Sequence, residues 1–179
     1  MKAPLHISLF VACCLCLAEF HAGQRVVHIA SLHVGHRETA ANRSDLIDNW
    51  NRRLGLPVGS NYCASFLAYV LDSAQVEYPT VRSGVAQHYI TRQSIPASHV
   101  IHGREIPAGY IAVWKRGNTW MGHVEIVRDT WKGGSGLTIG ANTTSGIAGD
   151  QRQGNGVYKR SRHIDQTAYF RITHFTPVY

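Results

Sequence analysis

The chain has 179 residues, with 18 Lys and Arg against 11 Asp and Glu, so its formal net charge is +7. With 44% apolar and 16% charged residues it is not a disordered polyelectrolyte, and its length suits one folded domain. Three of its four cysteines lie in the first sixteen residues, which argues against a disulfide framework.

The N-terminus has the pattern of a secretory signal peptide. Lys2 gives a positive start, and residues 7–18 are almost wholly apolar. This run is shorter than the ~20 residues that a membrane-spanning helix needs, and small residues follow it. We predict a signal peptide over residues 1–23 and a secreted or periplasmic mature protein. The alternatives are a lipoprotein processed at Cys13 and a buried N-terminal helix.

Removal of residues 1–23 would leave Cys63 as the single cysteine of an exported chain, with the net charge still +7. Such a thiol has no partner for an internal disulfide, so it is a buried core residue, an intermolecular bridge or a reactive group. Because an exported thiol oxidises readily, its retention favours a functional role. We expect the polar, His-rich residues 24–41 to form a mobile lead-in, and residues 42–179 to form a single domain.

Helical patterns follow the lead-in. Ser44 can cap a helix that ends at Gly55, because apolar residues recur at helical spacing between them. A second helix is predicted over residues 62–73 and a weaker third over residues 83–92.

After Pro107 the periodicity changes to that of strands separated by glycine-rich turns. Helices first and antiparallel strands second predict an α+β fold. The predicted strands cover residues 110–114, 123–128, 137–142, 157–160 and 169–175.

Cys63 lies at the predicted start of the second helix. The unsatisfied N–H groups and the positive dipole end there favour a thiolate and lower the pKa of a cysteine. The same N–H groups can hold the oxyanion that forms when a thiolate attacks a carbonyl, and Asn61 and Tyr62 are further candidate donors. Cys63 is therefore the candidate nucleophile.

A thiolate needs a base, and the base needs a group that orients it. His123 opens a strand, and Asn142 on the next strand can accept a proton from its ring. The order Cys, His, Asn is that of papain-like enzymes. Glu125 shares the strand face of His123 and could support it, but we expect an exposed strand acid. Trp120 is a candidate for a substrate groove.

These motifs resemble the CHAP domain, the cysteine, histidine-dependent amidohydrolase/peptidase module of peptidoglycan hydrolases. The resemblance runs from about residue 42 to the C-terminus and implies a papain-like α+β fold. In it Cys63 is the nucleophile, His123 the general base and Asn142 the orienting residue. The matching stretches are Gly55-Leu56-Pro57, Tyr62-Cys63-Ala64-Ser65-Phe66, Gly122-His123-Val124-Glu125-Ile126-Val127, Asn142-Thr143 and Gly156-Val157-Tyr158.

One departure from the family concerns the orienting acid. Where the family strand commonly reads Glu-Gly-Asn-Thr, this chain has Gly140-Ala141-Asn142-Thr143, so Asn142 must serve alone. An amide stabilises an imidazolium less well than a carboxylate does. The substitution Gly140→Glu is then expected to leave activity unchanged or to raise it.

Other chemistries fit the sequence less well. His99 and His102 offer only two metal ligands, the remaining histidines are irregularly spaced, and no calcium-type loop precedes Cys63, so we expect no metal and no cofactor. The cations are scattered apart from a small cluster over residues 159–162, so we expect no nucleic-acid partner. A net positive charge instead suits an anionic cell envelope.

We therefore expect an exported cysteine amidohydrolase or endopeptidase that hydrolyses amide bonds in peptidoglycan, without stable membrane insertion. Whether it is an N-acetylmuramoyl-L-alanine amidase or a peptidoglycan endopeptidase stays open. One alternative is a catalytically weak or inactive wall-binding protein on the same fold, which the missing acid at Gly140 suggests. Another is an antibacterial effector that degrades competitors' walls and needs an immunity or delivery partner.

Overall fold

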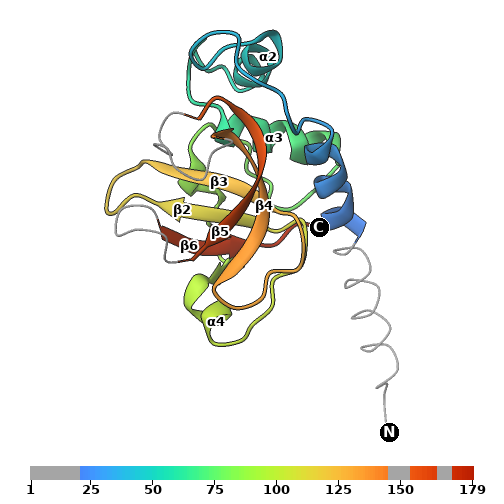
Figure 1. Ribbon diagram of the computed structural model, residues 1–179, viewed down its shortest axis with the longest axis vertical. Coiled ribbons are helices and arrows are strands. Elements are labelled where there is room, and N and C mark those ends of the chain that lie inside the picture. Colours follow the sequence, from blue (N-terminus) through green and yellow to red (C-terminus); the bar gives the residue numbers. More distant parts are fainter. Residues whose placement is uncertain (1–20, 145–153, 165–170) are drawn as a thin grey trace, which may run out of the picture.

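A computed structural model describes residues 21–144, 154–164 and 171–179. Helices of the N-terminal half pack on one six-stranded antiparallel sheet formed by the C-terminal half (Figure 1). The predicted α+β arrangement is confirmed.

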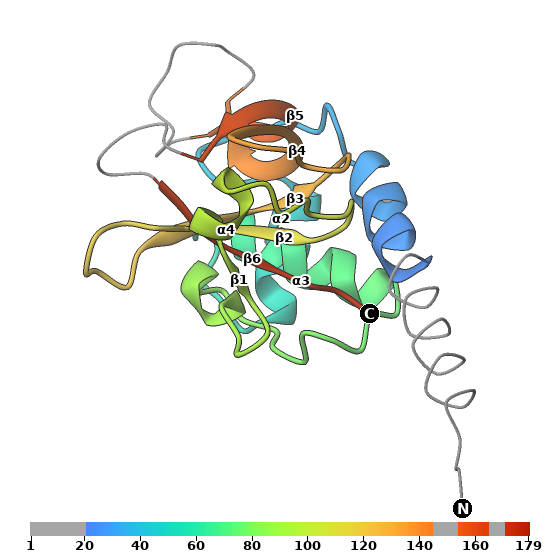
Figure 2. The same ribbon diagram turned by 90° about the horizontal axis from the view of Figure 1, so that it is seen from below.

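Two of the three predicted helices form as expected. Helix α2 (Asp45–Arg53) begins after Ser44, whose hydroxyl accepts a hydrogen bond from the Ile47 N–H at 3.2 Å, as a helix cap should. Helix α3 (Cys63–Ser73) lies along one face of the central strands, and almost its whole first two turns are buried (Figure 2). Cys63 is the first residue of this helix.

The third predicted helix is wrong in extent. Within residues 83–92 only the 3-10 helix η1 (Ala86–Tyr89) forms. The sequence analysis also missed strand β1 (Ile95–Pro96) and helix α4 (Ala97–Ile101). Both are too short to show a recognisable hydrophobic period.

The sheet has the strand order β1-β6-β2-β3-β4-β5, so the strand that carries His123 lies inside it. Alternate residues of the central strands face two hydrophobic clusters, one shared with α3 and one around Trp114 and Trp131. All five predicted strands are present: β2 (Ile111–Lys115), β3 (Gly122–Val127), β4 (Ser135–Thr143), β5 (Gly156–His163) and β6 (Arg171–Thr176).

A further helix precedes α2. Residues 21–31 are helical, and Ala22, Val26 and Ala30 are at most 1% exposed within the cluster that also holds α3. The first part of the lead-in expected over residues 24–41 therefore belongs to a helix that packs on the domain. The predicted signal peptide reaches into this helix, while residues 1–20 lie outside the described part of the chain.

None of the described helices combines the length and the apolar character that a membrane crossing requires.

The helix over residues 21–31 is held by a close backbone approach. A Cβ atom on Gly23 would overlap the carbonyl oxygen of Ala108, and one on Gly109 would overlap the backbone of Gly23. Gly109 also has a φ of +89°, which favours glycine.

We expect Gly23→Ala in the full chain to lower the free energy of unfolding by about 1–3 kcal/mol, because overpacking against backbone cannot be relieved by a rotamer change. Urea unfolding measures the effect. Gly134→Ala is the matched control, since a Cβ there meets nothing within 4 Å. Equal stability of both variants would contradict the packing of this helix.

Candidate active site

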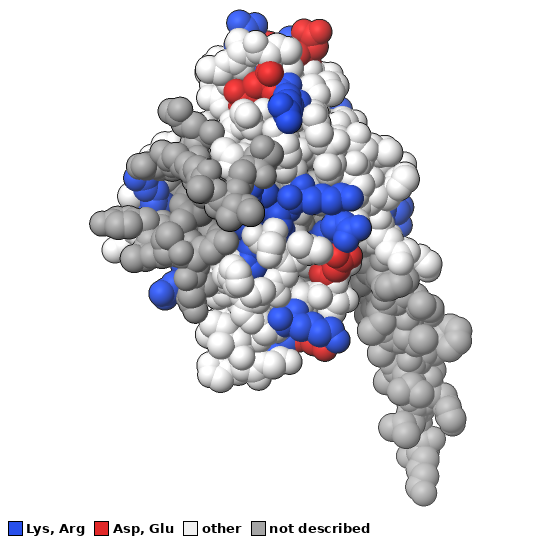
Figure 3. All heavy atoms as spheres, viewed as in Figure 1, with Lys and Arg blue, Asp and Glu red and all other residues white. Residues whose placement is uncertain are grey.

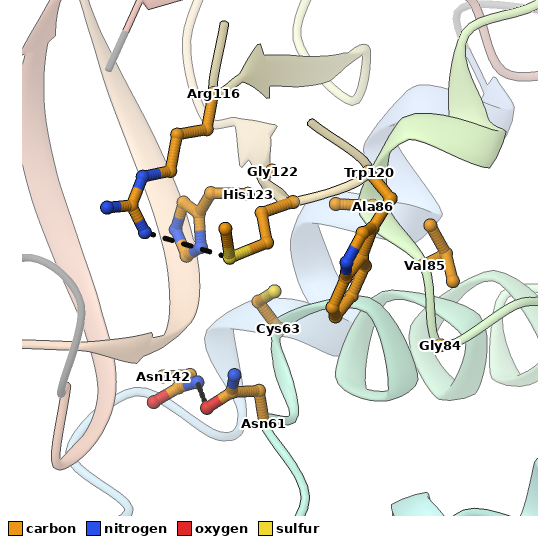
Figure 4. Close-up of a pocket in the computed structure, with 11 residues that line it drawn as sticks. Asn61, Cys63, Gly84, Val85, Ala86, Arg116, Trp120, Gly122, His123 and Asn142 are labelled. Atoms are coloured by element: carbon orange, nitrogen blue, oxygen red, sulfur yellow. Dashed lines mark hydrogen bonds between the residues drawn. The ribbon is translucent and has the colours of Figure 1, made fainter. Parts of the chain in front are cut away.

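The two residues predicted to carry the chemistry meet at one end of the sheet. Cys63 stands at the N-terminus of α3 and His123 near the start of β3, and they are 8% and 5% exposed. The thiol and the imidazole line the same pocket (Figure 4), and each shifts the pKa of the other toward its charged form. The predicted Cys–His pair is thus brought together.

The other side of the imidazole is held by a carboxylate. His123 Nε2 lies 2.9 Å from Glu125 Oε1, so with the proton on Nε2 the ring donates to the acid. Arg162 donates from Nε to Glu125 Oε2 at 2.9 Å and from its terminal nitrogen to Oε1. Thr138 adds a hydroxyl donor to Oε2. Glu125 is only 1% exposed, so the expectation of an exposed strand acid is wrong.

The position of the Glu125 side chain explains why residue 140 is a glycine. Strands β3 and β4 pair with Ile126 opposite Ile139, and the same register continued by one residue sets Gly140 opposite Glu125. A Cβ on Gly140 would overlap the carboxyl group of Glu125. Glu125 on β3 thus occupies the space that a side chain at Gly140 on β4 would need.

Burial opposes the charged forms of Cys63, His123 and Glu125, so their pKa values depend on how strongly the neighbouring groups stabilise each charge. Burial alone would raise the pKa of the Cys63 thiol, but His123 and two backbone N–H groups outweigh it and hold the pKa below its usual value. Burial would lower the pKa of His123, yet Cys63 and Glu125 raise it to about 9. Burial would raise the pKa of Glu125, while Arg162 and His123 hold it well below its usual range. All three shifts act in favour of the charged forms, a thiolate, an imidazolium and a carboxylate.

Asn142 lies in the same pocket but does not orient His123. Its Nδ2 donates to Asn61 Oδ1 at 3.1 Å, and its buried Oδ1 has no hydrogen-bond partner within the described residues. The predicted hydrogen bond between Asn142 and the imidazole is therefore absent, because Glu125 takes that place. Asn142 has a φ of +54° at a bulge of β4, a conformation that asparagine tolerates.

Of the two other candidate oxyanion donors, Asn61 lines the pocket and Tyr62 does not. Asn61 Oδ1 accepts the hydrogen bond from Asn142, and the amide nitrogen of Asn61 points toward Cys63 (Figure 4). The hydroxyl of Tyr62 instead donates to Glu38 at 2.9 Å, and the side chain is buried away from the pocket. Asn61 stays a candidate donor, whereas the Tyr62 side chain does not reach the site.

The residues around Cys63 enclose a pocket of about 150 Å³. Trp120 stands at its rim and is 73% exposed, which leaves its ring available to a substrate, while Trp114 is buried in the core. The lining residues are Asn61, Cys63, Gly84, Val85, Ala86, Arg116, Trp120, Met121, Gly122, His123 and Asn142.

Sequence reasoning missed two charged residues of this region, Arg162 and Arg116. Arg162 acts on the site through Glu125, and its partner follows only from the pairing of β5 with β4. Arg116 lines the pocket from the turn after β2. No sequence motif marks either residue.

Nothing in the described ranges groups three or more His, Cys, Asp or Glu residues as a metal site would require. Comparison of the chain with protein-family models, with curated proteins and with solved structures finds no match.

We expect Glu125→Gln to lower the pKa of the His123 imidazolium from about 9 by at least about one unit, because it removes the carboxylate and leaves the Arg162 charge uncompensated. The imidazolium then loses its proton at lower pH. NMR titration of the His123 ring nitrogens measures this shift.

The matched control is Glu105→Gln, which neutralises an exposed acid paired with Lys132. It should leave the titration of His123 unchanged. If Glu125→Gln is too unstable, Glu125→Gln combined with Arg162→Met removes both buried charges and should still lower the pKa. An unaltered pKa in a folded Glu125 variant would refute the electrostatic role of this acid.

Proposed function

We propose that this chain is an exported cysteine amidohydrolase or endopeptidase of the CHAP type that hydrolyses amide bonds in peptidoglycan. The observation that carries the chemical part is the buried series Cys63, His123, Glu125: Cys63 and His123 line one pocket and shift each other's pKa, and His123 Nε2 lies 2.9 Å from Glu125 Oε1. The substrate class is supported by the sequence resemblance, and export by the signal-like pattern of residues 1–23.

In the first half of the reaction the Cys63 thiolate attacks the carbonyl carbon of the scissile amide. The charge that develops on the carbonyl oxygen is held by N–H groups at the start of α3, with the Asn61 amide as a second donor. The C–N bond then breaks, and the amine leaves with the proton of the His123 imidazolium. The acyl group stays on Cys63 as a thioester.

Water completes the cycle. His123, now neutral, removes a proton from the water that attacks the thioester, and the C–S bond breaks to release a carboxylic acid and restore the thiolate–imidazolium pair. Glu125 keeps the imidazole oriented and stabilises its charged form in both halves. Asn142 is then a positioning residue for Asn61 rather than for His123.

The non-catalytic alternative loses its main support in this structure. An inactive wall-binding protein was suggested by the missing acid at Gly140, yet Glu125 supplies a carboxylate to the same histidine. An antibacterial effector would share the proposed chemistry and differ in its delivery or immunity partner.

We expect Cys63→Ala to abolish release of soluble fragments from peptidoglycan sacculi, with a loss of at least about 10³-fold. Mass spectrometry of the fragments made by the unmodified chain identifies the amide bond that is cut. Because alanine fits the buried position, the variant should keep its fold. Equal release by both proteins would exclude the cysteine mechanism.

Moving the acid from one strand to the other tests the origin of the orienting carboxylate. Glu125→Ala should lower the rate by on the order of 10²–10⁴-fold, since His123 loses its partner. Gly140→Glu alone should also lower it, because the new side chain overlaps Glu125; this replaces the expectation from sequence alone. Sacculus hydrolysis measures both variants.

The informative variant combines Glu125→Ala with Gly140→Glu. It removes the overlap and returns a carboxylate from β4, so it should recover part of the activity that Glu125→Ala loses. A double variant less active than both single variants, although folded, would show that the carboxylate cannot act from β4.

A further inference from the structure

Arg116 is a charged residue of the pocket that the proposed reaction does not use. It lies in the turn between β2 and β3 and lines the pocket together with Cys63 and His123. Figure 4 shows its side chain reaching over the histidine on the side away from Trp120. A substrate on Cys63 would therefore lie between a cation and an exposed aromatic ring.

The guanidinium of Arg116 lacks a strong partner. In the part of the chain that the structure describes, its one hydrogen bond goes to the thioether sulfur of Met121 at 3.7 Å, a weak acceptor. No carboxylate lies within ion-pair distance of it in that part. Five other arginines do have such a carboxylate: Arg43, Arg53, Arg82, Arg128 and Arg162.

The charges around the nucleophile make this position distinctive. The Cys63 thiolate and the His123 imidazolium cancel, and Glu125 cancels Arg162 behind them. Every remaining residue that lines the pocket is neutral except Arg116. With both pairs ionised, the pocket thus carries one uncompensated positive charge beside the reacting atoms.

The turn that presents Arg116 is held in place. The Arg116 N–H donates to the Met121 carbonyl at 3.1 Å, which closes the turn. Gln87 in η1 donates to the carbonyls of both Thr119 and Met121 at 2.6 Å. The guanidinium is therefore displayed from a fixed backbone, which lowers the entropy lost on binding a ligand.

We propose that Arg116 binds a carboxylate of the substrate close to the scissile amide, so that the preferred substrate is a peptide with a free carboxylate beside the bond that is cut. This inference rests on the proposed function. A guanidinium fork matches a carboxylate with two parallel hydrogen bonds, which are much stronger than its contact to a thioether. Trp120 would cover the other side of the bound chain.

The test compares two samples of one peptidoglycan preparation. In one the stem-peptide carboxylates are free, and in the other they are converted to carboxamides with carbodiimide and ammonia. The unmodified chain should hydrolyse the free form at least about tenfold faster, and Arg116→Gln should lose this preference by slowing on the free form alone. Arg116→Lys should retain part of it, since the charge stays and the fork is lost.

Arg52→Gln is the matched control. Arg52 is an exposed arginine in the last turn of α2, outside the pocket, and its removal lowers the net charge by the same amount. It should keep the preference of the unmodified chain, which separates a contact at Arg116 from general attraction to an anionic polymer.

The outcomes separate the two proposals. Hydrolysis of both samples at equal rates, or an unchanged preference in Arg116→Gln, would overturn the role of Arg116 while leaving the hydrolase intact. Absence of cysteine-dependent hydrolysis from both samples would overturn the proposed function itself. In that case, binding of the free-carboxylate fragments to Cys63→Ala but not to Cys63→Ala with Arg116→Gln would still support the carboxylate site.

Discussion

The site depends on a carboxylate that is buried between two cations. A charge taken out of water costs several kcal/mol unless it is paired and hydrogen-bonded, and Glu125 meets that condition through His123, Arg162 and Thr138. Without Arg162, the state of lowest free energy for the buried His123–Glu125 pair would be the neutral one, in which the proton has moved from the imidazolium to the carboxylate. The guanidinium lowers the pKa of Glu125, Cys63 and Glu125 raise the pKa of His123, and His123 lowers the pKa of Cys63.

This dependence separates what could be predicted from the sequence and what could not. Ser44 caps α2, Cys63 begins α3 and the strands alternate, because these signals are local and follow from capping and periodicity. The partnership of Glu125 with Arg162, 37 positions apart, depends on the register of the three consecutive strands β3, β4 and β5, which no local signal specifies. From the sequence alone, Gly140 indicates a missing acid; in the fold, the absence of a side chain at Gly140 leaves the space that the Glu125 carboxyl group occupies.

The N-terminal helix was missed for a different reason. Polar and His-rich composition over residues 24–41 indicated a lead-in, yet Ala22, Val26 and Ala30 recur every four residues and form a narrow apolar stripe of small side chains. The close approach at Gly23 depends instead on the missing Cβ atoms of Gly23 and Gly109. His33 likewise packs edge-on against Trp50 at 5.4 Å and is part of an aromatic cluster rather than a metal ligand set.

The net charge and the pocket charge act at different ranges. On the face drawn in Figure 3, Lys and Arg lie in separate groups with acidic residues among them, so the +7 charge forms no single binding surface there. Long-range attraction of this kind raises the rate of encounter with any anionic partner, but it does not set specificity. Discrimination between ligands requires a charge at contact distance whose neighbouring charges neutralise one another. Because Cys63 and His123 cancel, and Glu125 and Arg162 cancel, Arg116 is the residue of this pocket whose charge a substrate meets.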